Sequence, residues 1–239
     1  MIVDFHAHVL PHTDHGCDGS RIARRQLQLM RRGGTDAVVA TPHFYPNDDS
    51  VRSFLRRREG AIGAMRRKLP LEDLPTVYPA AEVLVCVGMH EMEGLEKLAV
   101  TGTNVILLEM PFSRWNDALI DTVLGVKARG LCPILAHIDR YFLEDVEILL
   151  QEGIRAQVNA EAFGTFQNPK PYVELMREGK VVALGSDLHG ARRAHYARFV
   201  RMRKRLGGVA DTVFAATSDL LVGAKSILEA DREPAELST

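Results

Sequence analysis

The residues in this sequence that could do chemistry are histidines and carboxylates, and two pairs of them share a spacing of two. His6 and His8 flank Ala7, and Asp187 and His189 flank Leu188. In an extended strand, side chains at i and i+2 point to the same side, so each pair can face one ion. Imidazole and carboxylate ligands without cysteine suit a catalytic Mn²⁺, Fe²⁺ or Zn²⁺ ion rather than a structural zinc. The spacing therefore predicts metal-dependent chemistry.

Further polar residues, a set of histidines, carboxylates and one amide, stand at the ends of short apolar segments, where a purely structural strand would stay apolar. These residues are His43, Glu82, Glu109, His137 and Asn159. Several carboxylates and histidines that converge on one point imply two or more ions. Paired ions can activate a bridging water and stabilise the leaving oxygen in phosphoester hydrolysis.

The loops beside these ligands carry more polar candidates. His12, Asp14, His15 and Asp18 follow the first histidine pair, and we expect at least one of them to bind an ion. Arg140 lies three residues after His137, and its guanidinium could bind a phosphate through two hydrogen bonds. Arg192 and Arg193 follow His189 and are candidates for the same role.

Seven apolar segments must position these residues. They are residues 2–8, 37–43, 77–85, 104–112, 132–138, 155–159 and 181–188. Each is short and rich in Val, Ile, Leu or Ala, as expected of buried parallel strands. Helical segments lie between them. Ser20 is expected to cap a helix that ends at Gly33, Ser50 a helix through Lys68, and Pro171 begins a helix that Gly179 ends.

A helix end, a glycine and an apolar strand recur in that order along the chain, as in β/α units. This pattern predicts an α/β fold, a distorted seven-stranded β/α (TIM-like) barrel, whose functional residues lie at the carboxyl ends of the strands. A doubly wound open sheet is the alternative. We expect a single domain over residues 1–228 and a polar tail over 229–239.

Composition excludes several classes of protein. The 239 residues are 46% hydrophobic with a net charge of -1, which excludes a largely disordered chain and disfavours a dedicated nucleic-acid binder. No apolar run approaches the roughly 18 residues of a membrane helix. Three scattered cysteines (Cys17, Cys86 and Cys132) form no disulfide framework, so a reducing, cytoplasmic location is expected.

Two other hydrolytic mechanisms lack their residues. A cysteine phosphatase needs an arginine six positions after its cysteine, but Ala23, Met92 and Ile138 occupy those positions. A serine hydrolase would need a Gly-x-Ser-x-Gly turn, which the sequence does not contain.

Seven short motifs, in order from residue 2 to about residue 190, resemble one known group of proteins. They are Asp-Phe-His-Ala-His at 4–8, Thr-Pro-His at 41–43, Pro-Ala-Ala-Glu at 79–82, Leu-Glu-Met-Pro-Phe at 108–112, His-Ile-Asp-Arg at 137–140, Gln-Val-Asn at 157–159 and Gly-Ser-Asp-Leu-His at 185–189. The chain resembles the polymerase and histidinol phosphatase (PHP) superfamily. More narrowly, it resembles the bacterial manganese-dependent protein-tyrosine phosphatases of capsule and exopolysaccharide biosynthesis.

The resemblance implies three metal ions, expected to be Mn²⁺, with Fe, Co or Zn as alternatives. It assigns the first ion to His6, His8, Glu82 and Asp187, the second to Glu82, Glu109 and His137, and the third to His15, His43 and His189. It also implies that a hydroxide bridging the ions attacks phosphorus, that Arg140 holds the phosphate, and that Asp187 and His43 assist catalysis.

Two departures from the subfamily leave assignments open. The chain has Asp14-His15-Gly16 where the subfamily has Asp-Asp-Gly, so either Asp14 or His15 is the loop ligand. The subfamily's second phosphate-binding arginine falls on Ala194, which leaves Arg192 or Arg193 for that role.

The function that the resemblance implies is a phosphotyrosine-protein phosphatase that regulates capsule synthesis and acts on a bacterial tyrosine kinase tail. A histidinol-phosphatase-like enzyme with the same metal site is the main alternative. An amidohydrolase, a regulatory scaffold and a DNA exonuclease are further alternatives. Seven basic residues between 192 and 205 could attract an acidic phosphotyrosine segment or an anionic membrane. The oligomeric state is left open.

Overall fold

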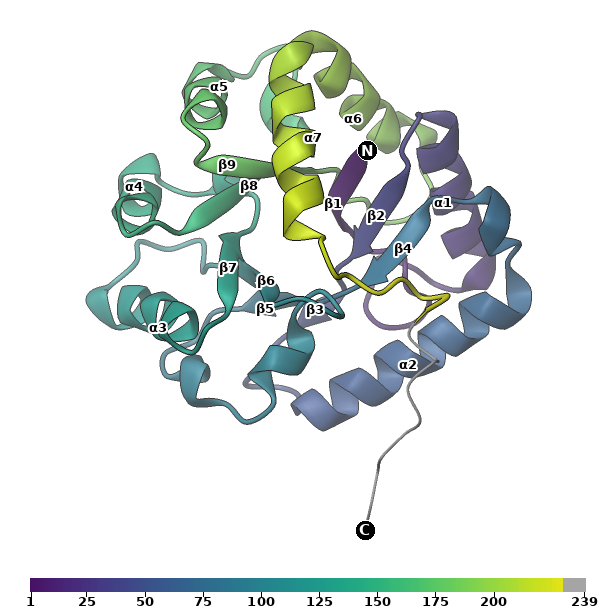
Figure 1. Ribbon diagram of the computed structural model, residues 1–239, viewed down its shortest axis with the longest axis horizontal. Helices are drawn as coiled ribbons and strands as arrows, with labels where there is room; N and C mark the ends of the chain where they lie inside the picture. Colours follow the sequence, from purple (N-terminus) through teal and green to yellow (C-terminus); the bar gives the residue numbers. More distant parts are fainter. Residues whose placement is uncertain (230–239) are drawn as a thin grey trace.

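Parallel strands form the centre of the fold, shown in Figure 1. The computed structural model describes residues 1–229, so the predicted tail lies outside the described residues except for Glu229. The strands are β1 (Val3–Ala7), β2 (Ala37–Ala40), β3 (His43–Phe44), β4 (Thr76–Pro79), β5 (Glu82–Leu84), β6 (Val105–Glu109), β7 (Cys132–Leu135), β8 (Arg155–Asn159) and β9 (Val181–Gly185).

Helices surround the strands (Figure 1). They are α1 (Ser20–Arg32), α2 (Val51–Lys68), α3 (Asp117–Ala128), α4 (Leu143–Gln151), α5 (Lys170–Arg177), α6 (Arg193–Leu206) and α7 (Gly208–Leu220). Five 3-10 turns complete the described structure: η1 (Leu71–Asp73), η2 (Met89–Glu91), η3 (Leu95–Leu98), η4 (Ile138–Arg140) and η5 (Ala160–Phe163). Among the described residues, no helix combines the length and the apolar character that crossing a membrane requires.

Two of the seven predicted strands break in the middle. The segment 37–43 divides into β2 and β3 around Pro42, which has no N–H to donate to a neighbouring strand. The segment 77–85 divides into β4 and β5, because β4 pairs with β2 and β5 pairs with β3. The strands therefore form two sheets, in the orders β1-β2-β4 and β3-β5-β6-β7-β8-β9.

The first strand lies beside the segment that follows the last one. Ala7 and Leu188 form a parallel bridge, the Asp187 N–H donates to the His6 carbonyl at 2.8 Å, and the His8 N–H donates to the Leu188 carbonyl at 3.2 Å. The two predicted ligand pairs are thus neighbours in space although about 180 residues separate them in sequence. The prediction of a single α/β domain built on parallel strands is confirmed.

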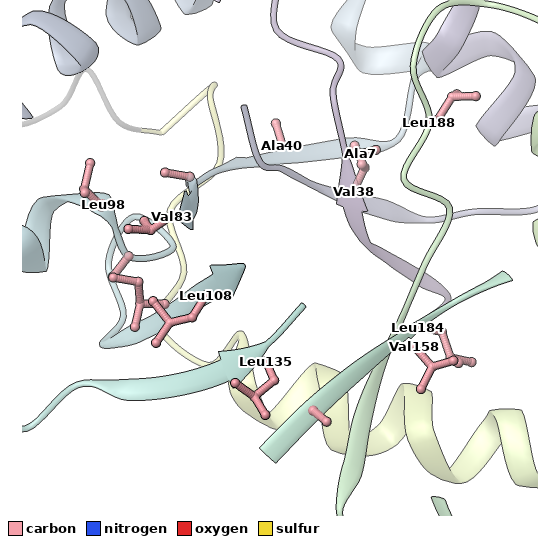
Figure 2. Close-up of a cluster of buried hydrophobic side chains, with 14 of the residues drawn as sticks. Ala7, Val38, Ala40, Val83, Leu98, Leu108, Leu135, Val158, Leu184 and Leu188 are labelled. Atoms are coloured by element: carbon pink, nitrogen blue, oxygen red, sulfur yellow. The ribbon is translucent and has the colours of Figure 1, made fainter. Parts of the chain in front are cut away.

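Apolar side chains on alternating strand positions form two clusters. One includes Val38 on β2, Leu108 on β6 and Leu135 on β7, which Figure 2 labels, and it extends to buried side chains of all seven helices α1 to α7. The other, named here the α7 cluster, includes Val39 and Leu107 and packs against the end of α7. Such alternation buries both faces of each strand, as parallel strands require.

Local sequence signals set the helix boundaries, with one exception. The Ser50 side chain accepts a hydrogen bond from the Ser53 N–H at 3.2 Å, and Pro171 lies in the first turn of α5, as predicted. The expected cap at Ser20 is wrong. Gly19 occupies the cap position of α1 without a side-chain bond, and Ser20 is the first helical residue.

Candidate metal centre

Glu82 is the centre of the polar cluster at the carboxyl ends of the strands. This buried residue begins β5, and three histidines from three other segments surround its carboxylate. His137 Nε2 lies 2.8 Å from Glu82 Oε1, and His43 Nδ1 and His6 Nε2 lie 3.0 and 3.1 Å from Glu82 Oε2. One carboxylate therefore links β1, β3 and the end of β7.

Asp187 and Glu109 supply the other carboxylates. Asp187 Oδ1 lies 3.3 Å from His8 Nε2 and 3.4 Å from His189 Nδ1. Glu109, at the end of β6, lies 3.6 Å from His137 and 3.8 Å from His43. We call these eight residues the histidine–carboxylate cluster: His6, His8, His43, Glu82, Glu109, His137, Asp187 and His189.

Four overlapping sets within this cluster have ligand atoms close enough to share an ion. They are His8, His43 and His189; His6, His8 and Asp187; His6, Glu82 and His137; and His43, Glu82 and Glu109. His15 belongs to none of these sets, but its ring stacks on His189 at 4.6 Å and on His43 at 5.2 Å between centroids. The structure thus brings eight of the predicted ligands to one place and stacks His15 on two of them.

The donor atoms of the cluster fit divalent metal ions. Glu82 Oε2, His43 Nδ1 and His189 Nε2 are buried and have no hydrogen-bond partner among the described residues. Buried polar atoms are nearly always satisfied, so nitrogen and oxygen atoms that face one another without a hydrogen bond are suited to ligate a cation.

Opposite charges shift the pKa values in the cluster. Burial disfavours charge on His137, but the carboxylates of Glu109 and Glu82 outweigh it and raise the pKa of His137 to about 9. Burial also disfavours charge on His8, but hydrogen bonds to the carboxylates of Asp14, Asp187 and Glu82 outweigh it and raise the pKa of His8. Since metal ligation needs neutral imidazole, an ion must displace these protons, and its affinity must rise with pH.

Asp14 contacts the His8 ring nitrogen that points away from Asp187. Its Oδ2 lies 2.6 Å from His8 Nδ1 and accepts the His43 N–H at 3.0 Å, while its Oδ1 accepts the Gly16 N–H at 2.8 Å. A carboxylate on the distal nitrogen fixes the ring orientation and leaves His8 Nε2 facing Asp187. Of the two loop candidates, Asp14 is therefore engaged in orienting a histidine, and His15 is the one stacked on the cluster.

Gln157 and Asn159 on β8 form a second layer that the sequence analysis only half recognised. Gln157 Oε1 accepts the His137 N–H at 2.7 Å and lies 3.3 Å from His6 Nδ1. Its Nε2 donates to Asn159 Oδ1 at 2.8 Å, and Asn159 Nδ2 donates to Asp187 Oδ2 at 3.2 Å. Asn159 was singled out as a strand-end residue, whereas Gln157 was named only within the Gln-Val-Asn motif. The i, i+2 spacing of Gln157 and Asn159, which puts both side chains on one face of β8, is the signal that could have found it.

The backbone around the cluster is unusual at two ligands and two glycines. His137 and Asp187 have positive φ angles of 28° and 48°, which cost energy in non-glycine residues and concentrate at functional sites. A Cβ on Gly16 would lie 2.1 Å from His8 Cβ, and one on Gly185 would lie 2.6 Å from His6 Cβ. These two glycines are needed because the histidines approach the backbone closely.

Asp4 joins two segments of the backbone beside the cluster. Its Oδ1 accepts the Ser186 N–H at 2.8 Å and the His6 N–H at 3.4 Å, which ties β1 to the segment that carries Asp187. Burial raises the pKa of Asp4 to about 6.

Two of the three candidate phosphate-binding arginines, Arg140 and Arg193, lie in different places. The Arg140 guanidinium, about one-third exposed, pairs with Asp187 at the edge of the cluster. Arg193 instead lines a groove between α1 and α6, together with Arg32 and Arg201. His12 and Asp18, the other loop candidates, are exposed outside the four ligand sets.

Two aromatic side chains that the sequence analysis did not single out border the cluster. The ring of Tyr45 stacks on His43 at 5.4 Å and is 37% exposed, and the ring of Phe112 stacks on His137 at 6.4 Å and is 62% exposed. These partly exposed rings form an apolar rim beside the histidine–carboxylate cluster.

Comparisons with known proteins agree with this architecture. The model of the family described as "Capsular polysaccharide synthesis, CpsB/CapC" matches residues 2–221. No curated protein sequence matches the chain. Among solved structures, one described under "YwqE from Bacillus subtilis and CpsB from Streptococcus pneumoniae, unique metal-dependent tyrosine phosphatases" gives a TM-score of 0.76 at 20% identity, over 94% of this chain and 96% of the other.

A more distant likeness is limited to the fold. A probable 2-pyrone-4,6-dicarboxylic acid hydrolase from Acinetobacter baumannii gives a TM-score of 0.50 at 12% identity, over 92% of this chain and 99% of the other.

Proposed function

The chain belongs to the CpsB/CapC capsular polysaccharide synthesis family, and on this premise we propose that it is a metal-dependent phosphotyrosine-protein phosphatase. The observation that carries the proposal is the convergence of five histidines and three carboxylates around Glu82, with Arg140 at their edge. The similar solved structures are described as metal-dependent tyrosine phosphatases, which supports the same reaction class.

The proposed cofactor is Mn²⁺, with three ions assigned as the resemblance implies. His6, His8, Glu82 and Asp187 would hold one ion, Glu82, Glu109 and His137 a second, and His15, His43 and His189 a third. The close approach of ligand atoms among His6, His8 and Asp187 and among His6, Glu82 and His137 supports this assignment. When bound, the ions supply positive charge that activates water for attack on phosphorus and stabilises the leaving oxygen.

The residues of the chain have separate tasks in this proposal. Arg140 donates hydrogen bonds to the phosphate oxygens and neutralises charge that develops on them. Its pairing with Asp187 holds the guanidinium ready at the edge of the cluster. Asp14 and Gln157 keep the rings of His8 and His6 in orientation. His43 and Asp187 complete the catalytic set.

The aromatic rim favours an aryl phosphate as the substrate. Tyr45 and Phe112 can contact the ring of a phosphotyrosine while its phosphate reaches the cluster. The leaving phenol has a pKa near 10, so its oxygen departs without strong acid assistance. The proposed substrate is a tyrosine-phosphorylated protein tail, as on a bacterial tyrosine kinase, with control of capsule synthesis as the outcome. Three free cysteines suit a cytoplasmic location.

Metal analysis together with a substrate panel tests the proposal. Purified protein should contain Mn²⁺, lose turnover after chelation and regain it when Mn²⁺ is added. At equal ionic strength, kcat/KM on a phosphotyrosine peptide should exceed the values for a phosphoserine peptide and for histidinol phosphate. Full turnover after chelation would exclude the metal mechanism. A preference for histidinol phosphate would exclude the protein substrate and leave a small-molecule phosphatase.

A further inference from the structure

A groove of about 730 Å³ lies between α6 and the loop that follows β8. We name it the α6 groove. Its loop side includes Glu161, Phe163, Phe166 and Gln167, and its helix side consists of Arg198, Arg201, Lys204 and Arg205. Four cationic side chains face one carboxylate, so the groove carries an excess of positive charge although the whole chain has a net charge of -1.

Two of the four cations are occupied by the loop itself. Arg198 pairs with Glu161, and the Arg205 guanidinium donates to the carbonyls of Phe163 and Gly164 at 3.1 and 3.4 Å. These contacts hold the loop against the helix and shape the groove.

Arg201 and Lys204 are the other two cations, and both are exposed. Neither makes a hydrogen bond or an ion pair with any residue between 1 and 229. Residues three and four apart on a helix are neighbours, so Arg198, Arg201, Lys204 and Arg205 repel one another. The opposite face of α6 is buried through Tyr196, Phe199 and Met202 and does not need them. Their concentration therefore favours an anionic ligand.

Both walls of the groove belong to segments that leave the histidine–carboxylate cluster. The loop wall starts at Ala160, directly after Asn159, whose amide contacts Asp187. The helix wall is part of α6, which begins four residues after His189 and lines the groove from Arg198 onward. A polypeptide that extends from the cluster can therefore continue along α6.

The shape and the aromatic content of the groove favour a peptide. Phe166 is 98% exposed on the loop side, where it can contact an apolar side chain of a ligand. A hollow between a loop and a helix suits an extended chain. A flat membrane surface would instead need a convex basic face, which a hollow does not offer. We infer that the α6 groove binds an acidic segment flanking the phosphotyrosine of the substrate protein. This inference rests on the proposed function and names the feature that selects among phosphotyrosine proteins.

Two phosphotyrosine peptides of equal length, one with Asp and Glu flanks and one with Ser and Gln flanks, test the inference. The Mn²⁺-loaded wild-type protein should hydrolyse the acidic peptide with a kcat/KM about tenfold higher at low salt, and the difference should shrink at high salt. The double variant Arg201→Glu/Lys204→Glu should lose this preference and keep its turnover of the neutral peptide.

The matched control is Arg52→Glu/Arg56→Glu on the exposed side of α2, which changes the net charge equally. It should keep the preference for the acidic peptide. Equal rates for both peptides in the wild-type protein, or the same loss in the control variant, would overturn the inference.

A binding measurement separates this inference from the proposed function. Fluorescence anisotropy of the acidic peptide without its phosphate should show binding that the double variant loses, even if neither phosphopeptide is hydrolysed. Absence of hydrolysis would refute the proposed function alone. Absence of this binding would refute the inference that the α6 groove binds an acidic segment. Sedimentation with vesicles containing anionic phospholipid covers the other class of ligand. Vesicle binding that the double variant loses, without any peptide preference, would overturn the inference in favour of a membrane contact.

Discussion

Val105 and Glu109 lie at the two ends of the same strand, β6, and the regions around them have opposite compositions. Val105 belongs to the α7 cluster, in which apolar side chains of several strands pack against the end of α7. Glu109 belongs to the histidine–carboxylate cluster, in which buried nitrogen and oxygen atoms face one another. Five residues of one strand therefore connect a region that stabilises the fold to a region that does chemistry.

The two regions contribute to stability with opposite signs. Apolar burial contributes about 25 cal/mol per Å² removed from water, so the α7 cluster stabilises the fold. Each buried polar atom without a partner costs about 1–3 kcal/mol, and the positive φ angles at His137 and Asp187 add strain of a similar size. The polar end of the strands therefore depends on the stability of the apolar region. A bound ion would recover part of the free energy of folding that the polar end costs.

The largest expected effect comes from Glu82→Gln in the polar region. The amide cannot replace a carboxylate that faces three histidines, so kcat/KM should fall by roughly 1000-fold or more, with loss of bound metal. The fold should remain, and circular dichroism should show a cooperative unfolding transition. The surface variant Glu147→Gln on α4 is the control. Normal turnover with full metal content in Glu82→Gln would remove Glu82 from the site.

Arg140→Ala is expected to have the next largest effect. Loss of one preorganised donor to the phosphate should lower kcat/KM by about 100- to 1000-fold. Metal content, measured by mass spectrometry, should not change, because Arg140 contacts Asp187 from the side and is no ligand. Loss of metal in this variant would assign Arg140 to the support of the cluster. Arg193→Ala, measured in parallel, tests the second predicted arginine.

Much of the polar region could be anticipated from the sequence. The i, i+2 pairs His6/His8 and Asp187/His189 are visible without a structure, and the structure brings both pairs to one place. What the sequence could not supply was the pairing between distant segments. The bridge from Ala7 to Leu188 and the bond from Asp14 to His8 depend on tertiary packing, which no local pattern encodes.

Strand boundaries and surface contacts were harder to predict for related reasons. Hydrophobic periodicity predicted one strand where the structure has β2 and β3. Periodicity reports which side chains are apolar and does not register the hydrogen bond that Pro42 cannot donate. Capping chemistry favours serine, yet Gly19 takes the position before α1. The basic residues of α6 were visible as a charged helix face, whereas the loop at Glu161 that turns this face into a groove was not.

The pH dependence of the metal-free protein should distinguish the two regions. His137 has a pKa of about 9 in the folded protein and about 6.5 when unfolded, since Glu109 and Glu82 outweigh burial. A raised folded-state pKa contributes stability that is fully present below pH 6.5 and lost as pH rises through 9. The free energy of unfolding in urea should therefore fall by the order of 3 kcal/mol between pH 6 and pH 9.5.

His137→Asn is the control for this pH dependence. Asparagine tolerates the left-handed backbone at this position and does not titrate, so the slope should flatten. An unchanged slope in the variant would show that other groups control the transition.

Leu221→Ala probes the apolar region. Leu221 follows α7 and is 6% exposed within the α7 cluster, so its truncation should cost about 2–3 kcal/mol, the lower part of the range for leucine because an edge site can relax. kcat per folded molecule and metal content should stay at the wild-type values. Denaturant unfolding and steady-state kinetics on the same sample measure both. A large loss of kcat with little change in stability would show that the two ends of the strands are coupled.

The smallest effect is expected for the cysteines, which belong to the apolar part of the molecule. Cys17 is fully buried, and burial raises its thiol pKa to about 11; burial also raises the pKa values of Cys86 and Cys132. Only a thiolate is a good nucleophile, so these protonated thiols cannot attack phosphorus near neutral pH.

In the variant Cys17→Ala/Cys86→Ser/Cys132→Ser, kcat/KM on a phosphotyrosine peptide should change by less than about threefold. Alanine at position 17 avoids placing an unpaired hydroxyl in the core. Stability can fall somewhat at this position, so turnover is compared at a temperature where both proteins are folded. A thousandfold loss of kcat/KM in the folded variant, with metal content intact, would place catalysis on a thiol. The chemistry would then not be confined to the polar region.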